Sequence, residues 1–138
     1  MATTEQEEVK YVYDIYEDRC PTRMVLERLA DKWALLVLAR LEQTHTPVRF
    51  NALKRGIKGI TQKMLTQTLR KLERDGLISR QVFNTVPVTV EYALTPLGDT
   101  LTETVATLAH WAEKNIDAVL AAQAQWDTRQ QTMSGAEE

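Results

Sequence analysis

The side chains of this sequence best suited to chemistry are the cations, amides and hydroxyls of residues 61–75, TQKMLTQTLRKLERD. At about 100° per residue, these polar side chains fall on the side of a predicted helix opposite its leucines. Such groups can hydrogen-bond base edges and phosphate oxygens in the major groove of DNA. The side chains concerned are Gln62, Lys63, Thr66, Gln67, Arg70 and Arg74. We expect Glu73 and Asp75 to point elsewhere, so that this face carries no acid.

The segments around this helix favour DNA recognition over an ordinary solvated amphipathic helix, which would show the same pattern. Thr61 can cap the first turn, and Gly76 can adopt the left-handed conformation just past the last turn. Upstream, a short helix capped by Asn51 and ending near residue 55 is followed by a tight turn over 56–60. Two helices joined by such a turn form a helix-turn-helix, whose second helix enters the major groove.

Charge is distributed unevenly along the chain, although the net charge is −2. Residues 49–80 contain nine Lys or Arg and two acids, a net charge of +7, whereas residues 1–48 and 81–138 carry net charges of −3 and −6. A basic block between acidic flanks indicates one face directed at phosphates. Arg49 and Arg80 belong to this block, and we assign both to the DNA-binding set. We expect Arg70, Arg74 and Arg80 mainly to hold phosphates.

Length and composition indicate one domain without a membrane span. The chain has 138 residues, 43% of them hydrophobic and 26% charged, which is enough to bury a core without disulfides. It has no long apolar run and no signal sequence, so we expect a cytoplasmic protein with no membrane partner. His45, His110 and the single cysteine, Cys20, are far apart in sequence, so we expect no metal site. The chain also lacks a phosphate loop, a carboxylate pair and a nucleophile elbow, so we expect no enzymatic activity and no cofactor.

After the helix over 61–75 the hydrophobic period changes from 3.6 to 2, which predicts two strands. The first covers about 78–83 and the second about 90–94, with a loop over 84–87 (NTVP) between them. Such a hairpin would be the wing of a winged helix. Residues 48–50 are long enough for an edge strand.

The dipeptide Cys20-Pro21 marks the start of the first core helix, because proline is favoured at the first helical position. That helix covers residues 22–30, and a second helix, capped by Asp31, covers about 32–41. The second helix is apolar on nearly all sides and belongs in the core. The first helix is expected to bury Val25, Leu26 and Leu29.

Apolar residues at both ends of the chain predict a homodimer. Thr95 and Pro96 open a long final helix that runs to about Gln123 or beyond and overhangs so small a domain. Its apolar stripe needs a second subunit to cover it, as does an N-terminal arm over residues 1–19 with a short helix from about Glu8. We assign Tyr13, Tyr16, Leu108, Trp111, Ile116 and Leu120 to the dimer interface.

Together these elements predict a mainly α fold with a small β-hairpin wing (α+β), a winged helix-turn-helix with N- and C-terminal dimerisation helices. We expect a partly disordered arm over 1–19 and a DNA-binding domain over 20–95. A dimerisation helix over 96–127 and a disordered tail over 128–138 follow.

The order of these motifs resembles a known family of bacterial regulators. The runs LADKWALLVLARL, RFNALKRGIKGITQKMLTQTLRKLERDGLISR and VPVTVEYALTPLG resemble the HxlR-type winged helix-turn-helix regulators, a branch related to the MarR-type regulators. The resemblance covers about residues 20–112 and implies a homodimer that binds operator DNA and represses or activates neighbouring genes. One departure is Thr89, which stands where the family's wing usually has Lys or Arg. A weaker or neutral wing contact should follow.

Cys20 is the candidate for a redox or electrophile sensor. A thiol at a helix N-terminus lies near the positive end of the macrodipole and near free N–H groups, which favours the thiolate. Arg19 and Arg23 add positive charge nearby, whereas Glu17 and Asp18 oppose it. Several members of the family that this chain resembles have a Cys-Pro here, and some use it to sense quinones, aldehydes or hypochlorite. The alternative is that Cys20 is a small hydrophobic residue packed between arm and core.

Three function classes remain open on the sequence. We favour a dimeric DNA-binding transcriptional regulator that reads an inverted-repeat operator through residues 61–75. Its signal is an electrophile or oxidant acting on Cys20, or a small-molecule effector without a thiol switch. The second class is a winged helix used for protein–protein contact alone, which a failure to retard any DNA would favour. The third is a thiol enzyme, for which no His or Asn is placed to act as the base.

Overall fold

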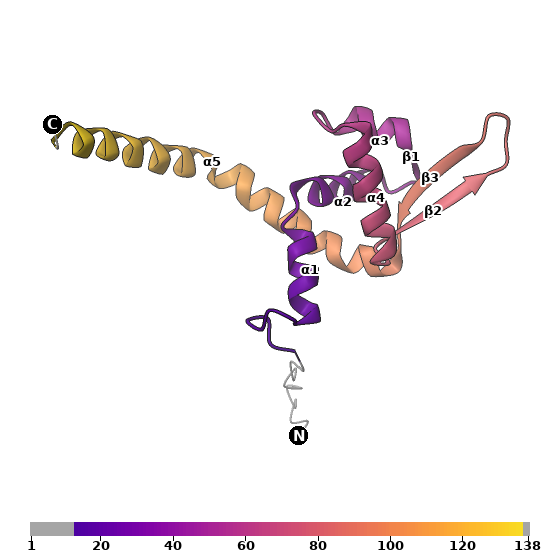
Figure 1. Ribbon diagram of the computed structural model, residues 1–138. Coiled ribbons are helices and arrows are strands. Elements are labelled where there is room, and N and C mark those ends of the chain that lie inside the picture. Colours follow the sequence, from indigo (N-terminus) through magenta and orange to yellow (C-terminus); the bar gives the residue numbers. More distant parts are fainter. Residues whose placement is uncertain (1–12, 137–138) are drawn as a thin grey trace, which may run out of the picture.

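The computed structural model describes residues 13–136, and the fold is mainly helical with a small antiparallel sheet (Figure 1). The elements are α1 (Pro21–Leu29), α2 (Lys32–Thr44), β1 (Val48–Arg49), α3 (Phe50–Gly56), α4 (Gln62–Arg74), β2 (Ile78–Phe83), β3 (Thr89–Leu94) and α5 (Pro96–Ala136). Helices α3 and α4 form the helix-turn-helix, and β2 and β3 form the wing. The predicted winged helix-turn-helix fold is confirmed.

The core of the fold is the contact between α2 and α4. Leu38 of α2 is fully buried, and so are Leu65 and Leu72 of α4. Removing one leucine side chain of this kind from water contributes about 1.5–3 kcal/mol to stability, which fixes the inner face of α4. The outer face of the same helix is thereby directed away from the body.

Helix α4 begins and ends where the sequence predicts. The hydroxyl oxygen of Thr61 accepts a hydrogen bond of 3.1 Å from the backbone N–H of Met64. At the other end Gly76 has a φ of +75°, and the N–H of Leu77 donates to the carbonyl oxygen of Leu72 at 3.0 Å. This 6→1 bond is the mark of a Schellman motif, which satisfies carbonyls that the last turn leaves free. Both ends of α4 are therefore set by local sequence.

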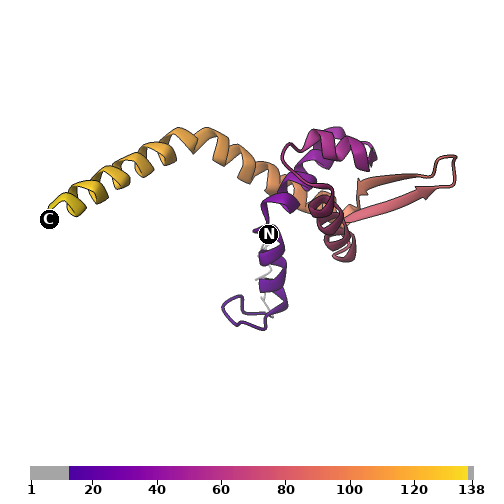
Figure 2. The same ribbon diagram turned by 45° about the horizontal axis from the view of Figure 1, so that its top comes forward.

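The three strands lie in the order β1-β3-β2, and both pairs are antiparallel. The wing strands pair from Ile78 opposite Leu94 to Phe83 opposite Thr89, which leaves residues 84–88 as the loop. The hairpin projects from the body well beyond the helices in both views (Figure 2). The hairpin prediction is confirmed, and its second strand begins one residue earlier than expected.

Helix α5 starts at the end of α4 and then leaves the body. Thr95 caps it, because its hydroxyl oxygen accepts a 3.0 Å hydrogen bond from the N–H of Gly98. The same hydroxyl donates to the carbonyl oxygen of Gly76, which joins the two helix ends. The far half of α5 extends away from the rest of the chain, on the side opposite the wing (Figures 1 and 2).

Besides the start of β3, four expectations about the fold differ from the structure. Residues 128–136, expected to be disordered, continue α5, because they extend a helix that is already formed, no proline interrupts them, and Arg129, Gln130, Gln131 and Met133 have good helix propensity. Helix α3 begins at Phe50 rather than after Asn51, because β1 runs directly into it and Phe50 packs against the core. Val25 and Leu26 are each 48% exposed rather than buried, because α1 projects from the body and its outer side meets no other element (Figure 1).

The fourth difference concerns the arm. Residues 13–19 form turns rather than a helix, and the rest of the expected arm helix lies outside the described residues. Within residues 13–136, no helix has both the length and the apolar character that crossing a membrane requires.

Candidate nucleic-acid interface

The outer face of α4 carries the side chains that the sequence assigned to DNA. Gln62, Lys63 and Gln67 are exposed in its first half, and Arg70 and Arg74 are exposed in its second. Thr66 is half-buried, and its hydroxyl donates to the carbonyl oxygen of Gln62 at 2.8 Å. The hydroxyl of Thr66 therefore keeps its acceptor capacity for an incoming donor.

A groove of about 450 Å³ separates α4 from the wing and brings four of the predicted residues together. We call it the helix–wing groove. Its lining comprises Gln62, Thr66, Leu69, Arg70 and Glu73 of α4, with Phe50, Arg80 and Tyr92. Amide, hydroxyl and two guanidinium groups thus surround a partly apolar floor. This is a suitable surface for a phosphate strand flanking a major groove.

Glu73 contradicts the expectation that the outer face of α4 carries no acid. It lines the helix–wing groove with Arg70 and Arg80. It lies seven residues after Thr66, about two helical turns, and therefore on the same face. The seven-residue spacing from Thr66 was therefore sufficient to predict that Glu73 lies on this face. Its carboxylate reduces the positive charge of the groove without cancelling it.

Arg74 lies elsewhere, at the C-terminal end of α4. It lines a second groove of about 600 Å³ between α4, α1 and the start of α5, together with Met24, Val25 and Leu97. Asp75 does point away from the outer face, as expected. Its Oδ2 accepts a hydrogen bond of 2.7 Å from Nε of Arg28. The structure therefore does not bring Arg74 together with the groove residues.

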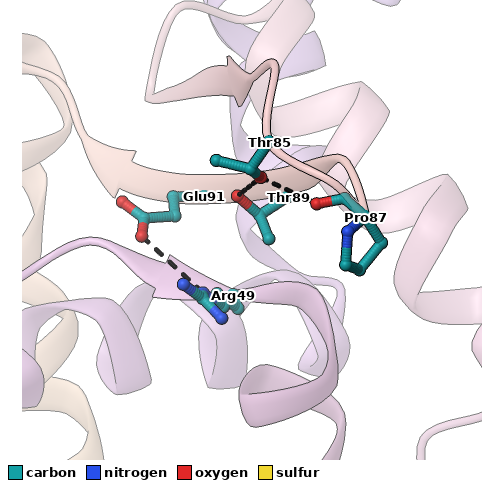
Figure 3. Close-up of polar contacts among 5 residues, drawn as sticks. All are labelled: Arg49, Thr85, Pro87, Thr89 and Glu91. Carbon is teal, nitrogen blue, oxygen red and sulfur yellow. Dashed lines mark hydrogen bonds and ion pairs between the residues drawn. The ribbon is translucent and has the colours of Figure 1, made fainter.

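Arg49 lies on β1, the edge strand on the other side of β3 from β2, and its side chain is 65% exposed. Its Nε is 3.8 Å from Oε1 of Glu91 on β3 (Figure 3). An exposed pair of this length contributes little, so Arg49 remains available to a phosphate. Three further exposed cations lie in α3 and the turn after it, and they were not among the predicted DNA contacts: Lys54, Arg55 and Lys58. The charge count over 49–80 already contained them.

Cys20 is the N-cap residue of α1, but its side chain makes no capping hydrogen bond. The thiol side chain is 7% exposed, and the backbone N–H of Cys20 donates to the carbonyl oxygen of Glu17 at 3.1 Å. Arg23 Nη1 donates to the carbonyl oxygen of Tyr16 at 3.4 Å, which holds the preceding turn against α1. Cys20 is therefore buried at the point where the turn over 13–19 joins α1.

The six residues assigned to the dimer interface are all exposed in the single chain. Their exposed fractions run from 48% for Ile116 to 86% for Tyr16. Met24, Val25, Leu26, Trp126 and Met133 are further exposed apolar side chains that were not assigned. So many large apolar groups on α1 and α5 exceed what an isolated small domain usually exposes. Among residues 13–136, no three His, Cys, Asp or Glu side chains lie close enough to hold a metal ion.

Comparison with known proteins identifies similar chains over most of this sequence. The family model described as HxlR-like helix-turn-helix matches residues 28–120. The chain is 45% identical over 109 residues to YtfH of Escherichia coli (strain K12), an uncharacterized HTH-type transcriptional regulator; the match covers 78% of this chain and 84% of YtfH.

Solved structures agree with these sequence matches. The candidate transcriptional regulator YtfH from Salmonella typhimurium is 40% identical with a TM-score of 0.75, and the match covers 80% of this chain and 97% of that one. The redox regulator HypR in its reduced form is 37% identical with a TM-score of 0.66, and the match covers 73% of this chain and 98% of HypR.

Proposed function

The chain belongs to the HxlR-like helix-turn-helix family of transcriptional regulators, and on that premise we propose that it is a homodimer that reads an inverted-repeat operator. As a member of this family it is a DNA-binding regulator and not an enzyme. In the proposed dimer, the two α4 helices occupy successive major grooves of one DNA face, about 34 Å apart.

The observation that carries this proposal is the outer surface of α4 and its continuation into the helix–wing groove. Gln62, Lys63, Thr66 and Gln67 lie in the first turns of α4, and these are the positions that reach base edges when a recognition helix enters DNA by its N-terminal end. Arg70, Arg80 and Arg74 lie further toward the wing and the C-terminal end of α4. There they hold phosphates.

The exposed apolar side chains of α5 support the dimer. Trp111 is 58% exposed and Leu120 is 52% exposed, on a part of the helix that leaves the body of its own chain (Figure 1). Burying one such side chain against a partner contributes about 1.5–3 kcal/mol. In a twofold dimer the same residue is buried in both subunits, so each position contributes twice.

Two alanine variants test the roles along α4, on a duplex that the protein itself has selected from a random pool. Gln67→Ala should change the order of preference among operator variants, because it removes a base-edge contact. Arg74→Ala should weaken binding to all duplexes alike and flatten the slope of log affinity against log salt by about one unit for each subunit. If Arg74→Ala changed sequence preference and Gln67→Ala changed nothing, α4 would lie in DNA with another orientation.

A second element of the proposal is a thiol switch at Cys20. Two observations favour it: Cys20 is the N-cap residue of α1, and HypR, a structure similar to this chain, is a redox regulator. Its burial also suits the alternative of a purely packed residue. A sensor at this site therefore needs a local opening of the chain around Cys20 before a reagent can reach the sulfur.

A further inference from the structure

The wing of this chain is almost free of charge. Between Arg80 and Lys114 the sequence contains no Lys or Arg, and Glu91 is the one charged residue of the hairpin beyond Arg80. We call residues 84–88 the wing tip. Val86 is fully exposed there, and Val88 is 61% exposed. The surface that the hairpin presents at its end is therefore apolar rather than cationic.

The wing tip is held in shape by its own hydroxyls (Figure 3). The hydroxyl of Thr85 donates to the carbonyl oxygen of Pro87 at 2.7 Å, and its oxygen lies 3.3 Å from that of Thr89. Since a hydroxyl has one proton and that of Thr85 is already used, Thr89 is the donor in the second contact. The hydroxyls of Thr85 and Thr89 are thus bonded within the hairpin, and Val86, Pro87 and Val88 are exposed beside the polar side chain of Asn84.

The acid nearest to this surface is on β3. Glu91 lies 3.8 Å from Arg49 of the neighbouring strand, on the body side of the wing tip (Figure 3). Glu91 is the one charged residue of the hairpin beyond Arg80, and the positive charge of Arg49 on the neighbouring strand balances it. An uncharged tip can approach a phosphate-lined groove without repulsion, although it gains no attraction from it.

The hairpin is long enough to span from one DNA groove to the next. Strand β2 has six residues, so at about 3.3 Å per residue the hairpin extends roughly 20 Å from its base beside the end of α4. In B-form DNA the minor groove lies half a helical repeat, about 17 Å, from the centre of the neighbouring major groove. With α4 in the major groove, a hairpin of this length can therefore reach the adjacent minor groove.

We propose that the wing tip packs Val86, Pro87 and Val88 into that minor groove by apolar contact, with no cation. The inference rests on the proposed function, since it needs α4 in the major groove. Apolar side chains are used in this way by many minor-groove proteins. A contact of this kind releases no counterions, so it adds affinity that salt does not weaken. It also responds to the width of the groove rather than to its phosphates.

Two variants at one position test the proposal on the selected duplex, with dissociation constants measured over about 50–200 mM salt. Val86→Ala should weaken binding at least about fivefold at every salt concentration without changing the salt slope, because it removes two methyl groups from an apolar contact in each subunit. Val86→Lys places a cation at the same point in each subunit and should steepen the slope by about two units for the dimer. Val86 is fully exposed, so neither substitution disturbs the folded chain.

The outcomes separate this proposal from the one on which it rests. If the wild-type protein retarded no DNA, both would be overturned. If it bound its duplex but Val86→Ala bound with unchanged affinity, or Val86→Lys left the salt slope unchanged, the wing tip would not touch DNA and the α4 assignment would stand. Wild-type protein should also protect adenine N3 in the minor groove from methylation beside each half-site, and Val86→Ala should reduce that protection.

Discussion

The side chains of Arg28 and Asp75 join two helices that are far apart in sequence. Nε of Arg28, at the end of α1, donates a 2.7 Å hydrogen bond to Oδ2 of Asp75, the C-cap residue of α4. On the other side, Thr95 at the start of α5 bonds to the carbonyl oxygen of Gly76. The end of α4 is therefore held by the helices that precede and follow the winged unit. A movement of α1 or α5 would therefore be transmitted directly to the C-terminal end of α4.

The Arg28–Asp75 pair should contribute measurably to stability. The two side chains are 22% and 25% exposed, so the pair is better shielded than most surface pairs. Without Arg28, the carboxylate of Asp75 would face the negative end of the α4 dipole alone. We expect Arg28→Met and Asp75→Asn to show a coupling energy of about 1 kcal/mol in a double-mutant cycle. Urea unfolding at one fixed protein concentration measures it, and strictly additive effects would show that the contact is energetically neutral.

Gly98 is required by the close approach of α5 to the end of α4. A Cβ atom at Gly98 would lie 2.1 Å from the carbonyl oxygen of Leu77, which is backbone and has no room to move. Gly98→Ala should therefore destabilise the protein by roughly 2–3 kcal/mol despite the helix propensity of alanine.

Gly135→Ala is the matched control for that substitution. No atom lies within 4 Å of a Cβ built there, near the end of the same helix. Thermal unfolding followed by circular dichroism should show a lower midpoint for Gly98→Ala and an equal or slightly higher one for Gly135→Ala. Equal midpoints for the two variants would mean that the Gly98–Leu77 contact relaxes freely.

The sequence predicted best those features that local rules determine. Thr61 and Gly76 set the two ends of α4 through hydrogen bonds within a few residues, and the alternating strands of the wing set their own register. Glu73 was misplaced although its spacing from Thr66 was sufficient to locate it. Asn51 was misplaced because cap preference is weaker than the tertiary contact of Phe50 with the core.

Features that depend on groups outside one chain were the hardest to predict. Val25 and Leu26 were expected in the core of the chain, but each is 48% exposed in the single chain. The residue roles in DNA binding, dimerisation and sensing are properties of complexes, and they stay predictions here. The tail over 128–136 was misjudged because polar composition was weighed above helix propensity.

The dimer assignment predicts that an acid on the apolar stripe of α5 separates the subunits. Ile116 is 48% exposed, and Ile116→Asp would place a carboxylate in the interface of both subunits. We expect the dissociation constant of the dimer to rise at least about a hundredfold, because each dimer loses two apolar contacts and gains two buried charges. Sedimentation equilibrium over a dilution series measures this change.

Ala121→Asp is the control for charge and helix propensity, because residue 121 is exposed and lies about 140° round α5 from Ile116. It should leave the dimer intact. Should Ile116→Asp and Ala121→Asp dissociate alike, or should both remain dimers, the apolar stripe of α5 would not be the subunit contact.

The last prediction concerns the accessibility of Cys20. Cys20 is 7% exposed, so iodoacetamide should alkylate its thiol more slowly in the native protein than in urea. Arg23→Ala removes the hydrogen bond that ties α1 to the carbonyl oxygen of Tyr16, and it should speed alkylation of the native protein. This measurement tests access to the sulfur without any assumption about signalling.

Signalling requires that oxidation of Cys20 changes DNA affinity. Diamide takes two electrons from two thiols, so it joins the Cys20 sulfurs of two chains or joins Cys20 to a small added thiol. Either product adds bulk at the start of α1, whose far end is bonded to Asp75 at the end of α4. We expect diamide with a small thiol to change operator affinity by at least about fivefold, with no loss of helical circular dichroism. Cys20→Ser should bind the operator normally and ignore the treatment. Identical responses of wild type and Cys20→Ser would leave Cys20 as a packing residue.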